Sequence, residues 1–147
     1  MVSDPDLRFR VRPATWPRDA DALRAIRHAV FVVEQHVPEA LEWDGFDAEC
    51  AHAIALDTTG SPIGCARLLR DGHIGRMAVL QRYRGRGVGT ALLQRLIALA
   101  RERGHDHAIL NAQAHAQPFY ARFGFVAEGL EFTEAGIPHR KMVLVLR

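Results

Sequence analysis

The clearest chemical signature in the sequence runs from Arg84 to Gly89, where glycine alternates with other residues. A glycine-rich turn at the start of a helix points several backbone N–H groups at one place, beside the positive end of the helix dipole. Glycine lets the backbone approach a phosphate closely and adopt positive φ angles. The guanidinium groups of Arg82, Arg84 and Arg86 add bidentate donors for phosphate oxygens. We therefore expect an anion site at this turn.

The residues around this turn narrow the class of phosphate ligand. A P-loop needs Gly-Lys followed by serine or threonine, but the only lysine of the chain is Lys141. A dinucleotide fingerprint would place its third glycine where Thr90 stands, in a βαβ unit near the start of a parallel sheet. A helix start without a ligand is the remaining alternative, although these glycines make it a costly one. The turn therefore fits a phosphate ligand of another class best.

The charged residues are unevenly distributed along the chain, although the net charge is only +2. Seven acids and no lysine or arginine lie between Arg27 and Arg67, whereas six arginines and one acid lie between Gln81 and Arg103. A cationic ligand near the first stretch and an anionic ligand near the second would suit this asymmetry. Ordinary solvated faces are the alternative interpretation.

Length and composition predict a single globular domain over residues 1–147, because 48% of the residues are hydrophobic and 24% are charged. We expect a cytoplasmic protein, since no apolar stretch reaches the ~20 residues of a membrane span and the N-terminus is charged. Cys50 and Cys65 are expected to be reduced thiols. His105 and His107 lack further ligands nearby in sequence, so no metal site is predicted. The small net charge also argues against nucleic-acid binding.

Apolar periodicity predicts the elements that position these groups. A strand with Leu7, Phe9 and Val11 should close at Pro13, and Thr15 should cap a helix that fades before Pro38. An acid-rich surface connection is expected over 36–49. Further strands are predicted at 51–56, 63–69, 73–79, 108–112, 125–128 and 141–146, and further helices from the glycine turn to residue 103 and at 117–122. We therefore expect one α+β domain with a mixed sheet.

Two motifs in this order support a family resemblance. Arg84–Gly89 matches the Arg/Gln-x-x-Gly-x-Gly/Ala acyl-CoA loop of the GNAT superfamily of N-acyltransferases, and Ala116–Phe125 resembles its Ala-x-x-x-Tyr-x-x-x-Gly-Phe segment. Segments 30–35, 44–47 and 136–139, together with His52, are similar to the ElaA-like subgroup, so the resemblance covers nearly the whole chain. It implies a GNAT-like three-layer α+β fold, with a central mixed, splayed β-sheet flanked by helices.

The resemblance also implies where acetyl-CoA, the expected co-substrate, would bind. The pantetheine arm would pair with the strand before the glycine turn, and the turn's N–H groups would hold the pyrophosphate. A backbone N–H near Met77 or Ala78 would polarise the thioester carbonyl. The implied acyl-CoA-binding residues are Met77, Ala78, Val79, Arg84, Gly85, Arg86, Gly87, Val88 and Gly89.

The catalytic residues implied by the resemblance are an acid and a base. Tyr120 matches the position whose phenol protonates the departing CoA thiolate, and a core aromatic is its alternative role; Phe119 is the better core candidate. A primary amine with a pKa of ~10.4 is mostly protonated at pH 7, so a group must accept its proton. Glu34 is the first candidate, because it closes the first helix beside the acidic stretch.

Other residues could bind the acceptor or replace Glu34 as base. Asp44, Asp47 and Glu49 could attract a cationic amine, and His115 lies on the segment that leads to Tyr120. His139 could line the acceptor pocket or satisfy a local turn. A water-mediated base would leave no mark in the sequence.

Together these features predict an acetyl-CoA-dependent N-acetyltransferase. A small amine, or a lysine or N-terminal amine of a peptide, would attack the thioester directly in a ternary complex, since no lysine or suitable cysteine offers an obvious covalent intermediate. A non-catalytic acyl-CoA-binding sensor or regulatory module is the alternative. No metal, nucleic-acid or membrane partner is expected, and a homodimer is compatible with the superfamily.

Overall fold

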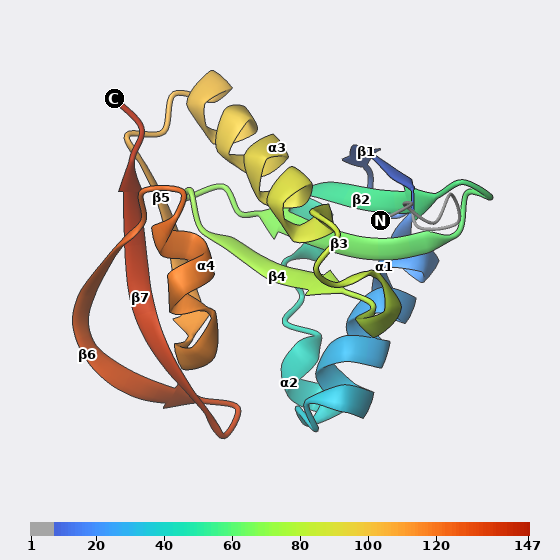
Figure 1. The fold of residues 1–147 in the computed structure, drawn as a ribbon, viewed down its shortest axis with the longest axis horizontal. Helices are drawn as coiled ribbons and strands as arrows, with labels where there is room; N and C mark the ends of the chain where they lie inside the picture. The colour runs from blue at the N-terminus through green and yellow to red at the C-terminus, as the bar shows by residue number, and fades with distance from the viewer. Residues whose placement is uncertain (1–7) are drawn as a thin grey trace, which may run out of the picture.

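The computed structural model describes residues 8–147, which form two antiparallel sheets flanked by helices (Figure 1). The first sheet has the strand order β1-β2-β3-β4 and the second has the order β5-β7-β6. The strands are β1 (Phe9–Ala14), β2 (Ala51–Asp57), β3 (Pro62–Leu68), β4 (Ile74–Val79), β5 (His107–Gln113), β6 (Val126–Glu134) and β7 (Ile137–Val145). The helices are α1 (Ala20–Arg27), the π-helical η2 (His28–Glu34), α2 (Glu39–Glu42), α3 (Val88–Glu102) and α4 (Gln117–Ala121), with 3₁₀ turns η3 (Asp47–Glu49), η4 (Gln81–Tyr83) and η5 (Ala114–Ala116).

The two sheets meet where β4 and β5 begin. A single parallel bridge joins His73 to Ile109, and the Ile109 N–H donates to the Gly72 carbonyl at 3.1 Å. Beyond this point β4 and β5 share no ladder and belong to separate sheets. The expected mixed, splayed sheet is therefore present, with its parallel contact confined to one end of the two strands.

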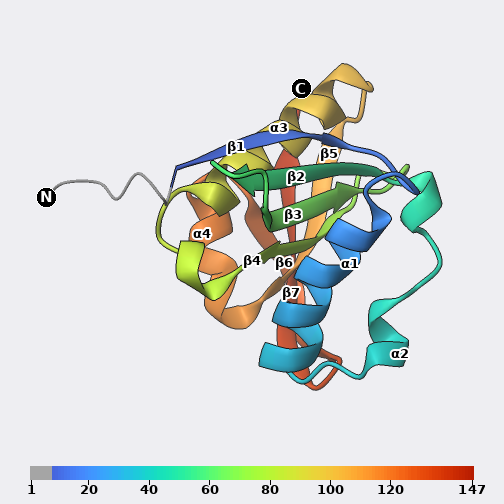
Figure 2. The same cartoon turned by 90° about the vertical axis from the view of Figure 1, so that its right-hand side faces the viewer.

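Helices cover both faces of the first sheet, and α1 and α3 lie on opposite sides of it (Figure 2). Successive residues of β2 and β3 face opposite apolar clusters: Ala53 and Ala66 belong to the cluster of α3, and their neighbours Ile54 and Cys65 to that of α1. This alternation is the period-two pattern of strands buried on both faces. The three-layer α+β prediction is confirmed.

The first turn of α3 packs closely on the end of β3. A Cβ atom at Gly64 would lie 3.1 Å from Val88 Cγ1 and 3.2 Å from Leu92 Cδ1, and 3.2 Å from the Ala78 carbonyl oxygen of β4. Only a glycine lets the helix approach this near without displacing its neighbours. Gly64 thus fixes where α3 begins relative to β4.

Strand β4 contains a bulge. Cys65 pairs with Ala78, but Arg67 pairs with Gly75, so that Arg76 and Met77 together face one residue of β3. Arg76 has a positive φ of 47°, which is uncommon for a residue with a side chain. A bulge bends a strand and re-aims its backbone groups. The re-aimed stretch includes Met77 and Ala78, the expected neighbours of the thioester.

Near the N-terminus the element boundaries differ from prediction. Leu7 lies outside the described residues. Pro13 does not close the first strand but pairs with Ala53 inside β1, which its position on the edge of the sheet allows. Thr15 does not cap the helix, because its N–H donates to the Asp19 carboxylate at 2.9 Å and α1 starts only at Ala20.

The last two strands are longer than predicted. They form a hairpin over 126–134 and 137–145, whereas only 125–128 and 141–146 were expected. Strand β6 is an edge strand that is exposed along nearly all its length, so its sequence lacks the apolar alternation on which the prediction depended. Gly129, with a φ of 74°, accompanies an irregular register that further hides the pattern.

Candidate functional site

The glycine turn lies between η4 and α3. Gly85 and Gly87 have φ angles of 74° and 87°, and no atom lies within 4 Å of a Cβ built at either position. Gly87 is the N-cap of α3, and no side chain caps this end of the helix. The N–H groups of the first turn thus have no side-chain acceptor, and the space before them is open. This is the local geometry that an anion site requires.

The same turn contacts the segment that carries Tyr120. A Cβ at Gly89 would lie 3.6 Å from Phe119 Cζ and 3.9 Å from Val79 Cγ2. The ring of Phe119 therefore packs where the glycine turn becomes α3, next to the end of β4. Packing in a core of this kind fixes α4, and with it Tyr120, relative to the turn.

Tyr120 is half-buried and lies edge-on to two aromatic rings. Its ring centroid is 5.1 Å from that of Phe119 and 6.1 Å from that of Phe125. Burial raises the pKa of Tyr120 to about 12, because the phenolate would lose its hydration. No residue in the described part of the chain forms a hydrogen bond with its hydroxyl. Tyr120 is thus a protonated phenol at neutral pH, with its O–H available as a donor.

Glu34, at the end of η2, forms a bidentate ion pair with Arg84 of the glycine turn. Arg84 Nη1 lies 2.5 Å from Glu34 Oε2, and Arg84 Nη2 lies 2.7 Å from Glu34 Oε1. Arg84 Nε donates to the Val79 carbonyl at 3.0 Å, which holds the guanidinium against the end of β4. The hydrogen bonds from Arg84 lower the pKa of Glu34. Residues fifty positions apart are therefore brought together beside the turn.

The residue next to Glu34 makes a contact on the other side. Gln113 Nε2, at the end of β5, donates to Gln35 Oε1 at 2.8 Å. Glu34 thus reaches the loop that follows β4, while Gln35 reaches the end of β5. The C-terminal end of η2 is anchored to both strands at the place where they have diverged.

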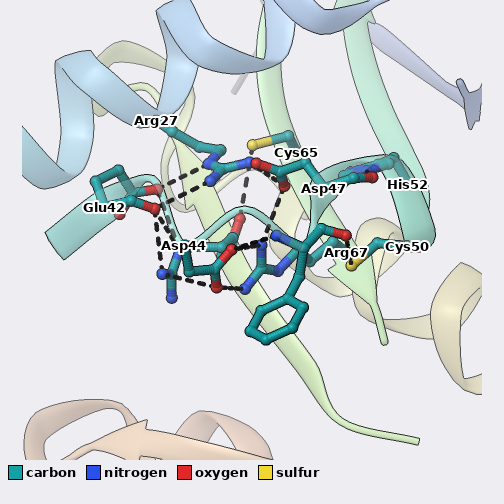
Figure 3. A network of polar contacts seen from close by, with 10 residues as sticks. Arg27, Glu42, Asp44, Asp47, Cys50, His52, Cys65 and Arg67 are labelled. Carbon is teal, nitrogen blue, oxygen red and sulfur yellow. Dashed lines mark hydrogen bonds and ion pairs between the residues drawn. The ribbon is translucent and has the colours of Figure 1, made fainter. Parts of the chain in front are cut away.

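The acidic segment 36–49 is a mostly exposed surface connection, as expected, but not all of its acids face solvent. Three of its acids point inward at three arginines from other elements and form what we call the buried ion network (Figure 3). The network consists of Arg27, Glu42, Asp44, Asp47, Arg67 and Arg76. Its charges balance, three against three, so the acidity of this stretch of sequence is largely neutralised in the fold.

The centre of the buried ion network is tightly bonded. Arg27 places Nε 2.7 Å from Glu42 Oε1 and Nη1 2.7 Å from Asp47 Oδ1. Arg67 donates to Asp47 Oδ1 at 3.0 Å and forms a close pair with Asp44. Burial would raise the pKa of Asp44, but the hydrogen bonds from Arg67 and the Phe46 N–H outweigh it and lower this pKa to about 2.

The structure separates the acids that the sequence grouped. Asp44 and Asp47, expected to attract an amine, are bound to arginines in the buried ion network, whereas Glu34 lies beside the glycine turn. Glu49 lies in η3 and has an exposed side chain. Glu34 is thus the carboxylate that the fold brings closest to the expected acyl-CoA loop.

The two candidate histidines lie in different environments. His115 is exposed on η5, before α4. His139 is buried in β7, where its Nδ1 donates to the Ile137 carbonyl at 2.7 Å and its ring stacks on Phe132 with centroids 5.9 Å apart. His139 is therefore engaged locally, although its strand neighbour Gln113 carries the contact with η2.

Sequence reasoning missed several of these partners. Arg27 is 1% exposed. It lies four residues after Leu23, on the apolar stripe of α1, and this position could have indicated that it is buried. A buried arginine needs carboxylate partners. The sequence pattern does not indicate the role of Arg76 or the Gln35–Gln113 hydrogen bond. Both result from the way strands pair and helices pack in the fold.

With the geometry established, comparisons with known proteins identify the class. The chain matches the acetyltransferase (GNAT) domain over residues 17–146 and belongs to this family. The chain is thus an acyltransferase enzyme, as predicted, and its family uses acyl-CoA as co-substrate and an amine as acceptor.

Individual relatives agree with this assignment. The chain is 38% identical over 122 residues to the uncharacterized N-acetyltransferase YjcF of Bacillus subtilis, covering 80% of this chain and 86% of that one. An acyl-CoA N-acyltransferase from Pseudomonas aeruginosa has 33% identity and a TM-score of 0.82, covering 92% of this chain and 99% of that one. Escherichia coli ElaA has 30% identity and the same TM-score of 0.82, covering 91% and 98%. The expected resemblance to ElaA is thus matched by structural similarity.

Within residues 8–147, no group of three or more histidine, cysteine, aspartate or glutamate side chains is placed to hold a metal ion. None of the helices there combines the length and hydropathy needed to cross a membrane.

Proposed function

We propose that this GNAT enzyme transfers an acetyl group from acetyl-CoA to an amine by direct attack in a ternary complex. The observation that carries the proposal is a single one: the diverging ends of β4 and β5 have an open glycine turn, a protonated phenol and a carboxylate beside them. These are an anion site, an acid and a base, which amide formation from a thioester requires.

In the proposed complex, acyl-CoA lies along β4. The backbone of Met77, Ala78 and Val79 pairs with the pantetheine arm, and the N–H groups of residues 84–89 hold the pyrophosphate. The bulge re-aims the backbone near Met77, which supports a role for an N–H there in polarising the thioester carbonyl. The chain thereby stabilises the oxyanion that forms in the transition state.

The proposed reaction involves three proton transfers. The acceptor ammonium first gives one proton to Glu34, directly or through a water, and the neutral amine attacks the thioester carbon. The C–N bond forms, the C–S bond breaks, and the departing thiolate takes its proton from the Tyr120 hydroxyl. The attacking nitrogen then loses its second proton to the tyrosinate, directly or through a water, which leaves a neutral amide and restores the phenol. Before the substrates bind, the hydrogen bonds from Arg84 lower the pKa of Glu34 and keep its carboxylate ionised. A carboxylate at this place favours binding of an ammonium.

Calorimetry and a thiol-release assay test the proposal. CoA should bind to the wild-type chain, and acetyl-CoA should release thiol with at least one member of a panel of polyamines, arylamines, amino acids and peptides. Absence of CoA binding would overturn the proposal, whereas binding without thiol release would favour the sensor alternative. Running the panel with longer acyl-CoA substrates tests the acetyl preference.

Two substitutions separate binding from chemistry. Tyr120→Phe should lower turnover about 10²-fold with little change in CoA affinity, because it removes only the acid. Gly87→Glu should weaken CoA binding at least about tenfold, because it adds a negative charge and strains a positive φ at the anion site. Equal losses of CoA affinity in both variants would contradict these roles, and thermal unfolding controls for folding.

Other expectations remain predictions. These are the cytoplasmic location, the single domain over 1–147, the homodimer, the absence of a nucleic-acid partner, and contacts of the acceptor with Asp44, Asp47, His115 or His139. Of these four residues, His115 and Asp44 are exposed, but Asp44 is paired with arginines, whereas Asp47 and His139 are buried.

A further inference from the structure

The ion pair between Glu34 and Arg84 joins two parts of the site that would bind different substrates. Arg84 opens the glycine turn, where the acyl-CoA phosphates are proposed to bind, and Glu34 is the carboxylate proposed for the amine. The bidentate geometry commits both Nη groups of Arg84 to Glu34, and Nε to the Val79 carbonyl. In this arrangement the Nη donors of Arg84 are bound to the Glu34 carboxylate.

The pair is accessible to a competing anion. The side chains of Arg84 and Glu34 are 39% and 38% exposed, whereas those of Arg27 and Glu42 in the buried ion network are 2% and 4% exposed. Exposed pairs of this kind are weak and exchange readily. Phosphate is a strong bidentate partner for a guanidinium, so a phosphate placed at the adjacent N–H groups can draw Arg84 away.

Releasing Glu34 would not release its segment. Gln35 stays bonded to Gln113 on β5, and Val30 remains in the apolar cluster of α1, so the end of η2 keeps its place. A carboxylate without its arginine would then lie beside the diverging strands. Its negative charge would be available to a cationic acceptor.

We infer that Glu34 and the phosphates of acyl-CoA compete for the guanidinium of Arg84, so that acyl-CoA binding frees the Glu34 carboxylate for the amine. This inference rests on the proposed function and adds a coupling between its two substrates. Before acyl-CoA binds, Arg84 blocks Glu34; afterwards, the same arginine neutralises phosphate charge. By linkage, a ligand that engages Glu34 in turn favours phosphate binding at Arg84.

If Glu34 competes with phosphate for Arg84, removing the Glu34 charge should raise the affinity for CoA. Glu34→Gln should tighten CoA binding by about two- to fivefold, because Arg84 no longer has to leave a carboxylate. Arg84→Met should weaken CoA binding by about fivefold, because one phosphate partner is lost. In the double variant, Glu34→Gln should add no gain over Arg84→Met alone.

The experiment is isothermal titration with CoA on the full chain. Glu39→Gln is the matched control, because it removes the same charge from a nearby exposed position. It should tighten CoA binding less than Glu34→Gln does. Thermal unfolding checks that every variant is folded, and Arg84→Lys provides a second variant that keeps the charge but loses bidentate bonding.

Three results separate the possibilities. No CoA binding to the wild type would overturn the proposed function itself. Normal wild-type binding with an unchanged or weaker affinity in Glu34→Gln would overturn only the competition. Glu34→Gln could also raise the CoA affinity equally in the wild-type and Arg84→Met backgrounds, or Glu39→Gln could raise it as much as Glu34→Gln does. Either result would assign the gain to the net charge and would overturn the competition.

Discussion

The buried ion network and the Glu34–Arg84 pair use the same chemistry in opposite settings. Arg27 is enclosed, meets two carboxylates at 2.7 Å, and holds the segment 36–49 against α1. Arg84 meets one carboxylate at the surface, beside an open glycine turn. An enclosed arginine cannot leave its partners without stranding charges, whereas an exposed one can change partner at little cost. Burial thus separates a structural ion pair from an exchangeable one.

The largest expected effect comes from breaking the buried ion network. Arg27→Met should lower the free energy of unfolding by about 3–5 kcal/mol, because Glu42 and Asp47 are left buried without their main partner. Urea denaturation measures the loss. Arg101→Met, at an exposed position in the last turn of α3, is the control and should change the stability by less than about 0.5 kcal/mol. A small loss of unfolding free energy in Arg27→Met would contradict the distinction between the buried ion network and the exposed Glu34–Arg84 pair.

A second effect is the pH dependence that Asp44 contributes. Its pKa is lowered from 3.8 to about 2, so its stabilisation is complete above about pH 4 and is lost as the pH falls toward 2. After allowing for partial solvent screening, the contribution is about 1–2 kcal/mol. Asp44→Asn should therefore be less stable than the wild type at pH 7, and the difference should shrink near pH 2.5. A difference that does not vary with pH would show that the ion pairs of Asp44 do not stabilise the fold.

A smaller effect is expected from the exposed pair. A double-mutant cycle of Glu34→Gln and Arg84→Met should give a coupling energy of about 0.2–1 kcal/mol in unfolding experiments. The cycle also cancels the loss of the hydrogen bond from Arg84 to the Val79 carbonyl. A coupling energy as large as the Arg27→Met loss would show that this pair is structural, and its exchange with phosphate would then be too costly.

The smallest effect is the response of the two settings to salt. The coupling energy of Glu34 and Arg84 should fall toward zero in 1 M NaCl, where the Debye length is about 3 Å. The cost of Arg27→Met should change little, because Arg27, Glu42 and Asp47 are almost fully enclosed and solvent ions do not reach them. Repeating the unfolding experiments at 0.05 M and 1 M NaCl checks this, and equal salt dependence would contradict the assignment by burial.

The sequence predicted the elements whose signals are local. Gly85 and Gly87 predicted a turn with positive φ angles, and both residues have positive φ angles in the structure. The apolar stripe of α3 gave its extent, and Gly104 follows its last turn as expected. These features depend on residues a few positions apart, for which spacing is a direct physical signal.

The missed features depend on residues that are distant in sequence. Glu34 was correctly singled out, but its partner Arg84 was assigned to phosphate alone, because nothing in the spacing relates the two. Asp44 and Asp47 were expected to face a ligand, because no arginine lies near them in sequence. The arginines that pair with them come from α1, β3 and β4, and only the fold brings them close. The bulge at Arg76 arises from strand pairing and has no local signature. A count of charges along a chain does not show which ones the fold will neutralise.

Gly64 fixes the distance between the first turn of α3 and the bulge in β4. Even a methyl group there would press on Val88, Leu92 and the Ala78 carbonyl, and α3 would have to yield by a few tenths of an ångström. Because Gly64 pairs with Val79, this contact holds the first turn of α3 at a set spacing from the bulge in β4. In the proposed complex that spacing is a ruler for the pantetheine arm: phosphates seated at the turn deliver the thioester to Met77 and Ala78.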